Sequence, residues 1–138
     1  MIKKIEHIGI AVKSIEESLK TFETLLGANS YKSEIVESES VRTAFLKIGE
    51  SKIELLEAIN DSSAIAKYLN KNREGFHHIA FEVTDIEKEL RRLEGEGFEL
   101  IHKSAKPGAD NKMIAFLHPK STKGLLVELC QEKPYKEL

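Results

Sequence analysis

The sequence has no tryptophan, a single cysteine and no long apolar run. The one cysteine, Cys130, can form no disulfide within the chain, which is typical of a reducing compartment. We therefore expect a cytoplasmic protein. No apolar run approaches the roughly 20 residues that a membrane helix needs, and no small-residue cleavage site follows the short apolar start of the chain. We expect neither a membrane partner nor a signal peptide.

The sequence also lacks an excess of either charge. Its 21 basic and 23 acidic residues leave a formal net charge of −2, and they form no basic stripe and no long run of one sign. The sequence therefore predicts no nucleic-acid partner. The 138 residues, of which 41% are hydrophobic and 32% charged, predict one compact globular domain.

An internal repeat spans most of the chain. Residues 7–22, HIGIAVKSIEESLKTF, align with residues 78–93, HIAFEVTDIEKELRRL, at an offset of 78 − 7 = 71. At the same offset, residues 44–46 (Ala-Phe-Leu) match residues 115–117. Near the end of each half, IELLE (53–57) matches VELCQ at 128 − 54 = 74. The sequence therefore predicts two related halves.

Each half has the pattern of a strand, a helix and three further strands. Apolar stripes with helical spacing indicate the helices, and these stripes are Ile15, Leu19, Phe22 and Leu26 in the first half and Ile86, Leu90 and Leu93 in the second. Ser14 with Glu17 and Thr84 with Glu87 have the spacing of capping boxes. A third helix is expected between the halves. The expected strands are 4–12, about 30–36, 41–48 and 52–58 in the first half, and 76–83, about 98–103, 112–117 and 124–130 in the second.

These elements predict an α+β fold of two tandem βαβββ modules. Each helix can cover only one face of its sheet, so the other faces must meet or enclose something. We expect a cupped eight-stranded mixed sheet, in a single domain of residues 1–132. The modules are expected at about 1–60 and 75–132, with the linking helix at about 61–74 and a C-terminal tail at 133–138.

Two histidines and two glutamates occupy matching positions on the open faces of the two halves. Successive side chains of a strand point to opposite faces. In the first strand of each half the apolar side chains share the face under the helix, so His7 and His78 point to the open face. The same alternation turns Glu54 and Glu128 of the last strands to that face. His77 points the other way, and we expect it to be structural.

This set of side chains predicts a metal site. A single strand histidine or glutamate is more often structural, but buried carboxylates are costly without a cation, and here they recur at matched positions. Imidazole nitrogens and carboxylate oxygens suit a borderline divalent ion such as Co, Ni, Zn, Mn or Fe. We expect His7, Glu54, His78 and Glu128 to be the ligands, with coordination positions left for water or substrate. Whether the four meet within one chain or across a dimer stays open.

With these residues the sequence resembles a known family. The paired βαβββ halves with a His, Glu, His, Glu set are similar to the vicinal oxygen chelate superfamily. That superfamily includes glyoxalase I, extradiol dioxygenases, fosfomycin-resistance enzymes and methylmalonyl-CoA epimerase. The sequence resembles the epimerase branch most, over about residues 4–132. The segments that carry the resemblance are IEHIGIAVKSIEESL, KIELLEA, SSAIAKYLNKN, EGFHHIAFEV and FLHPKSTKGLLVELCQ.

The resemblance implies a metal-dependent epimerase. Such an enzyme removes the α-proton of methylmalonyl-CoA and returns a proton on the other face, through an enediolate that the metal stabilises as a Lewis acid. His7, Glu54, His78 and Glu128 match the metal ligands of the family. The implied partner is an acyl-CoA or a thiol adduct, and we expect a homodimer.

Two strand positions, and the loop of residues 107–111, depart from the epimerase pattern. Some epimerases carry a glutamate base in the third strand, where VRTAFL places Thr43, and a glutamine where Glu54 stands. We therefore expect the base to be Glu54 or Glu128, as a carboxylate that leaves the metal. Lys112 is expected to meet the CoA phosphates. The expected substrate-binding residues are Thr43, Phe45, Lys112, Ile114 and Phe116.

Two alternatives stay open. The four-ligand set also resembles glyoxalase I (lactoylglutathione lyase), which shifts a proton in a thiol hemithioacetal through a similar enediolate. The other alternative is a non-catalytic small-molecule binding protein of the bleomycin-resistance type. Such proteins work without a metal, so the four retained ligands count against it.

Overall fold

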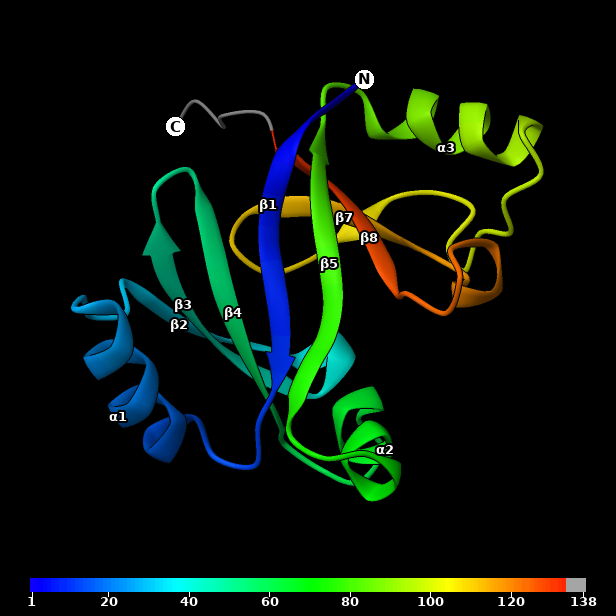
Figure 1. The fold of residues 1–138 in the computed structure, drawn as a ribbon. Coiled ribbons are helices and arrows are strands. Elements are labelled where there is room, and N and C mark those ends of the chain that lie inside the picture. Colours follow the sequence, from blue (N-terminus) through cyan, green and yellow to red (C-terminus); the bar gives the residue numbers. More distant parts are fainter. Residues whose placement is uncertain (134–138) are drawn as a thin grey trace. The chain divides into compact units, whose positions relative to one another are not determined.

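The computed structural model of the chain describes residues 1–133 and contains two βαβββ runs separated by helix α2 (Figure 1). The eight strands form one mixed sheet in the order β2-β3-β4-β1-β5-β8-β7-β6, which confirms the predicted α+β class. The strands are β1 (Ile2–Ala11), β2 (Lys32–Val36), β3 (Val41–Ile48), β4 (Ser51–Ala58), β5 (Gly75–Val83), β6 (Lys106–Pro107), β7 (Lys112–Leu117) and β8 (Val127–Glu132). The helices are α1 (Ile15–Leu26), α2 (Ala64–Lys71) and α3 (Ile86–Gly95). None of the helices in residues 1–133 has the length and apolar character that crossing a membrane requires.

The chain divides into two compact units. We call residues 7–77 the N-terminal unit, and residues 1–6 with the segment from His78 onward the C-terminal unit. The single domain and the module bounds of about 1–60 and 75–132 stay predictions. Of the predicted tail at 133–138, all but Lys133 lies outside the described residues.

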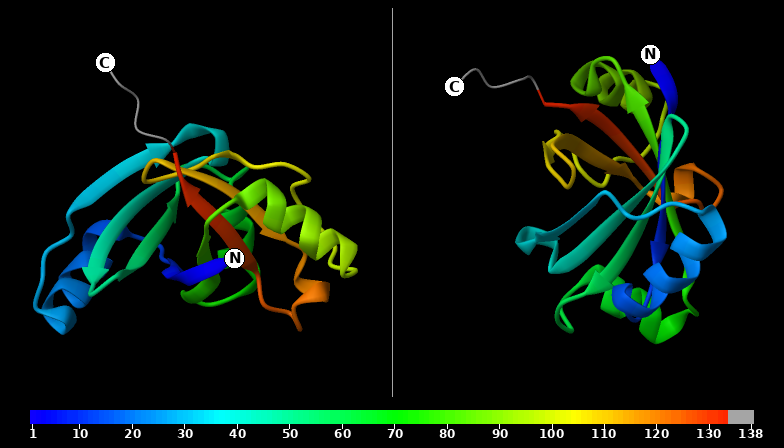
Figure 2. Two further views of the ribbon diagram at one scale, coloured as in Figure 1. Left: turned by 90° about the horizontal axis from the view of Figure 1, so that it is seen from above. Right: turned by 90° about the vertical axis from the view of Figure 1, so that its left-hand side faces the viewer.

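In the N-terminal unit, α1 and α2 pack on opposite faces of one sheet. β2, β3 and β4 are antiparallel neighbours, and residues 7–11 of β1 run parallel to β4. α1 packs on one face with the predicted stripe, and Figure 2 shows it beside β3 and β4. Ile65 of α2 packs with Ala11, Val41 and Leu56 from the other face. The face opposite α1 is therefore covered by α2 at one end only of its strands.

The C-terminal unit repeats this arrangement. β6, β7 and β8 are antiparallel neighbours, and β5 runs parallel to β8. The predicted stripe of α3, Ile86, Leu90 and Leu93, is buried with Ala115 and Leu129. Figure 2 shows α3 beside β8. The two units thus share the topology that the internal repeat predicts.

The first residues of the chain belong to the C-terminal unit through polar contacts. The Thr84 N–H donates to the Met1 carbonyl at 3.1 Å, and the Met1 ammonium lies 2.5 Å from the buried Glu89 carboxylate. Arg92, and after it the Met1 ammonium, lower the pKa of Glu89 below its usual value by hydrogen bonding to it. Lys3 pairs with Glu82 at 3.4 Å. These contacts attach the start of β1 to β5 and α3.

Short polar side chains begin the helices. Ser14 caps α1 as predicted, because its side chain accepts the Glu17 N–H at 3.2 Å. The predicted cap of α3 is wrong by one residue: Asp85, not Thr84, caps that helix and accepts the Lys88 N–H. Both residue types form caps, so the sequence pattern alone does not separate them.

The strand expected at 98–103 is wrong. In that segment only Leu100 makes an isolated bridge, and the two-residue strand β6 pairs with β7 instead. The His102 Nδ1 accepts the Phe116 N–H at 3.0 Å, while the Ile101 and His102 N–H groups both donate to the Phe116 carbonyl. A side chain thus takes the place of a backbone acceptor, and a regular ladder does not form.

A side chain of the last strand caps the helix in each unit. The Ile15 N–H donates to Glu57 Oε1 at 2.7 Å, and the Ile86 N–H donates to Gln131 Oε1 at 2.8 Å. Both donors begin a helix, where N–H groups have no partner within the helix. Glu57 and Gln131 are equivalent in the repeat, at 131 − 57 = 74. The sheet therefore holds the start of each helix in the same way.

Removing this cap should destabilise the protein. We expect Glu57→Ala to lower the free energy of unfolding by about 1–2 kcal/mol, because the Ile15 N–H loses its acceptor. Glu57→Gln retains an acceptor oxygen and should cost clearly less. Urea denaturation of the two variants measures the difference, and equal losses would contradict the capping role.

Candidate active site

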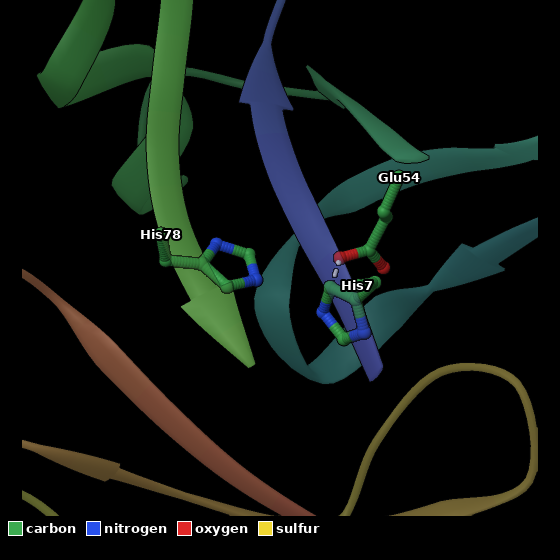
Figure 3. A group of neighbouring side chains, drawn as sticks. All are labelled: His7, Glu54 and His78. Atoms are coloured by element: carbon green, nitrogen blue, oxygen red, sulfur yellow. Dashed lines mark ion pairs between the residues drawn. The ribbon is translucent and has the colours of Figure 1, made fainter. Parts of the chain in front are cut away.

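In the N-terminal unit, His7 and Glu54 form a buried pair. The His7 Nε2 lies 3.3 Å from Glu54 Oε1, and their side chains are 6% and 7% exposed. Figure 3 shows this pair as a dashed line between His7 on β1 and Glu54 on β4. The parallel pairing of the two strands sets Gly9 opposite Glu54. Because Gly9 has no side chain, the carboxylate can lean toward the imidazole two residues earlier.

In the C-terminal unit, His78 and Glu128 form the equivalent pair. The His78 Nε2 lies 3.1 Å from Glu128 Oε1, and their side chains are 3% and 6% exposed. Here Ala80 lies opposite Glu128 in the parallel pairing of β5 with β8. His78, drawn on β5 in Figure 3, also contacts the Phe116 ring edge-on with the ring centroids 5.4 Å apart. The repeat thus places the same two groups, beside the same kind of small residue, once in each unit.

His77 has a different environment from His78, as strand alternation predicts. Its ring contacts the Tyr68 ring of α2 edge-on, with the centroids 5.0 Å apart. The Tyr68 hydroxyl donates to the Phe76 carbonyl at 2.7 Å. His77 therefore packs where α2 meets the start of β5.

The predicted lining residues lie on the strands next to those that carry the glutamates, on β3 beside β4 and on β7 beside β8. Phe45 is opposite Glu54, and Phe116 is opposite Glu128, so each unit places a phenylalanine beside its glutamate. Thr43 follows on the same face of β3 and is 1% exposed. In the C-terminal unit, Phe116, Ile114 and Lys112 follow one another on one face of β7.

Lys112 is a buried cation. It is 4% exposed, and its Nζ lies 3.3 Å from Glu132 Oε1, although the Glu132 side chain is 73% exposed. The predicted encounter with CoA phosphates therefore concerns a lysine that already has a carboxylate partner. An anionic ligand would have to compete with the carboxylate of an exposed glutamate.

Sequence reasoning missed four polar side chains. The caps from Glu57 and Gln131 lie inside the matched segments IELLE and VELCQ, so the repeat could have indicated them. The acceptor role of His102 has no such signal. Glu34, on the same face of the N-terminal unit as Glu54, was not singled out either.

Comparison with known proteins identifies the family of the chain. A family model described as the glyoxalase/bleomycin resistance protein/dioxygenase superfamily matches residues 6–116. The mitochondrial methylmalonyl-CoA epimerase of Dictyostelium discoideum is 38% identical over 129 residues, which are 93% of this chain and 78% of the relative. The chain belongs to the methylmalonyl-CoA epimerase branch of this superfamily. The resemblance seen in the sequence, and with it the class of epimerase-like isomerases, is confirmed.

Solved structures agree with this membership of the epimerase branch. The structure of the hypothetical protein BH1468 from Bacillus halodurans C-125 has 43% sequence identity and a TM-score of 0.92, and the match covers 98% of each chain. A methylmalonyl-CoA epimerase solved in complex with methylmalonyl-CoA and NH4+ has 32% identity and a TM-score of 0.93, with 100% of each chain covered.

Proposed function

We propose that the chain is a metal-dependent methylmalonyl-CoA epimerase. The observation that carries the proposal is the buried His–Glu pair that recurs in both units of a chain from the epimerase branch. The relative solved with methylmalonyl-CoA supports an acyl-CoA substrate. A homodimer and a cytoplasmic location stay predictions.

The spacing within each His–Glu pair suits a divalent ion. Two ligand atoms that each lie roughly 2.1 Å from one ion are roughly 3.0–3.4 Å apart in tetrahedral or octahedral geometry. The nitrogen–oxygen separations of 3.3 Å and 3.1 Å fall within that range. His7, Glu54 and His78 are buried, and each offers one atom that could hold a metal ion. We propose Glu128 as the fourth ligand, with Co, Ni, Zn, Mn or Fe as the candidate ions.

The proposed reaction exchanges one proton at the α-carbon of the thioester. A bound divalent ion supplies a Lewis acid that polarises a carbonyl oxygen. We propose that the Glu54 and Glu128 carboxylates carry the proton, since a carboxylate is basic enough near neutral pH to accept it and to return it as an acid. Phe45 and Phe116, beside the two glutamates, would keep water from the acyl group.

The remaining predicted residues would bind the other parts of the substrate. Thr43 and Ile114 each stand two residues before the phenylalanine of their strand and on the same face. They would contact the acyl group. Lys112 lies opposite Glu132, four residues along β8 from Glu128, which is roughly 13 Å of extended strand. That separation suits a group far from the thioester, and we propose that Lys112 binds a CoA phosphate in place of Glu132.

The test uses racemic methylmalonyl-CoA in D2O with the metal-loaded protein. We expect interconversion of the two epimers and entry of deuterium at the α-carbon. A parallel assay offers the hemithioacetal of methylglyoxal and a thiol. Turnover of that adduct without exchange in methylmalonyl-CoA would support the glyoxalase alternative. Acyl-CoA binding that needs no metal, without any exchange, would support the binding-protein alternative.

The two adjacent histidines should differ in their effect on metal binding. We expect His78→Ala to lose most of the bound ion, because the imidazole paired with Glu128 is removed. His77→Ala should keep the ion, because its ring packs against Tyr68. Metal content after dialysis, measured by atomic emission, compares the two variants. The same metal content in both would refute the ligand assignment.

A further inference from the structure

Glu34 lies on the same face of the N-terminal unit as Glu54. The pairing of β2 with β3 sets Glu34 opposite Thr43. The pairing of β3 with β4 sets Phe45 opposite Glu54. Residues opposite each other share a face of the sheet, and so do next-but-one residues of a strand. Glu34, Thr43 and Glu54 therefore project from the face opposite α1.

No other strand residue of this face in the N-terminal unit, which the structure describes in full, is a carboxylate. Apart from Glu34 and Glu54, the strand residues of this face are lysines, apolar residues, Thr43 and His7. These other residues are His7, Gly9, Ala11, Lys32, Val36, Val41, Thr43, Phe45, Lys47, Lys52, Leu56 and Ala58. A proton acceptor with a carboxyl group on this face is therefore Glu34 or Glu54.

The two carboxylates differ in their surroundings. The Glu54 side chain is 7% exposed and is engaged by His7, whereas the Glu34 side chain is 30% exposed and lies 3.5 Å from the Lys32 ammonium. Partial exposure lets Glu34 exchange a proton with water between turnovers. Because Glu34 is not a proposed ligand, a change in its protonation leaves the metal ligands unchanged.

The distances suit a small acyl group between the two glutamates. Glu34 and Glu54 are two strands apart, which is roughly 10 Å, and offset by one side-chain step of roughly 7 Å along the strand. Thr43 lies between them with a short side chain. Glu34, Thr43, Leu56 and Ala11 lie opposite one another on four neighbouring strands, and Glu34 has the longest side chain of the four.

We infer that Glu34 is a further catalytic residue, which shares proton transfer on the N-terminal unit with Glu54. The inference rests on the proposed epimerase function. The Glu34 carboxylate takes the α-proton and becomes a carboxylic acid, while the electron pair of the C–H bond moves into the thioester carbonyl to give an enolate. A second carboxylic acid then donates a proton to the other face of the α-carbon, and that electron pair forms the new C–H bond. Glu34 finally releases its proton to water, and the second acid regains one.

The test is Glu34→Gln in the metal-loaded protein. We expect kcat for methylmalonyl-CoA to fall by about 10²-fold, with the metal content unchanged, because a carboxamide does not accept the proton. The matched control is Glu17→Gln, which alters an exposed carboxylate paired with Lys20 at 3.6 Å, and it should leave kcat unchanged. The double variant Glu34→Gln/Thr43→Glu returns a carboxylate to the neighbouring position and should regain at least about tenfold of the loss.

Each result decides the inference. A Glu34→Gln variant within about threefold of the wild-type kcat would overturn it, and so would a loss that Thr43→Glu does not relieve in a variant with the wild-type melting midpoint. If Glu34→Gln does not fold, Glu34→Asp replaces it: a shorter carboxylate should lower kcat and leave KM unchanged. A wild-type protein that does not epimerise methylmalonyl-CoA would instead overturn the proposed function, and this inference with it.

Discussion

Glu128→Gln should lower the turnover of methylmalonyl-CoA by about 10²–10⁴-fold, the usual contribution of general acid–base catalysis. Glu128 is buried and lies 3.1 Å from His78. The glutamine amide oxygen can still bind a metal, so part of the ion should remain, but the amide cannot accept the α-proton. The kcat of the metal-loaded variant, together with its metal content, separates loss of proton transfer from loss of the ion.

Glu54→Gln should lower turnover in the same direction but by less. Glu34 shares the proton transfer on that unit under our inference, whereas we assign Glu128 no such second carboxylate. Thr43→Val is the control, because it keeps the shape of the side chain and removes a hydroxyl that is no base near neutral pH. It should cost much less than either glutamine variant. If Thr43→Val abolished α-proton exchange while both glutamine variants stayed active, the base would have to lie elsewhere in the pocket.

The internal repeat explains why so much of the fold could be predicted from the sequence. His7 and His78 begin matched segments, and strand alternation alone turns both away from the helices. The structure places each beside the glutamate of the neighbouring parallel strand, with Gly9 and Ala80 opposite those glutamates. Both halves of the repeat predict the same order of strands and helix, so each half supports the topology predicted for the other.

Features without a counterpart in the repeat could not be predicted in this way. Glu34 lies on a five-residue strand, whereas β6 in the other unit has only two residues, so no aligned partner marks it. Its place beside Thr43 follows from the register of β2 against β3, which the sequence pattern does not specify. The strand expected at 98–103 failed because the His102 side chain accepts a backbone N–H. That contact depends on tertiary structure and leaves no periodic signal.

Removing the metal should lower thermal stability. An ion that binds only the folded state stabilises it by about 2.7 kcal/mol when its free concentration is 100 times its Kd. For a chain of this length, that corresponds to a fall in Tm of roughly 8 °C on chelation. Burial of Glu54 and Glu128 strengthens ion binding, because carboxylates are costly to bury without a cation. Scanning calorimetry with and without chelator measures the shift.

The two histidine variants make this test specific. His78→Ala removes a proposed ligand, so its Tm should already be low and should not respond to chelator. His77→Ala loses the ring contact with Tyr68 and should melt earlier than the wild type, yet it should keep the full response to chelator because its metal site is intact. An unchanged wild-type midpoint, with removal of the metal verified, would mean that the four side chains are stable without an ion. The His–Glu pairs would then be held by their own hydrogen bonds, and the metal dependence of the proposed reaction would have to be abandoned.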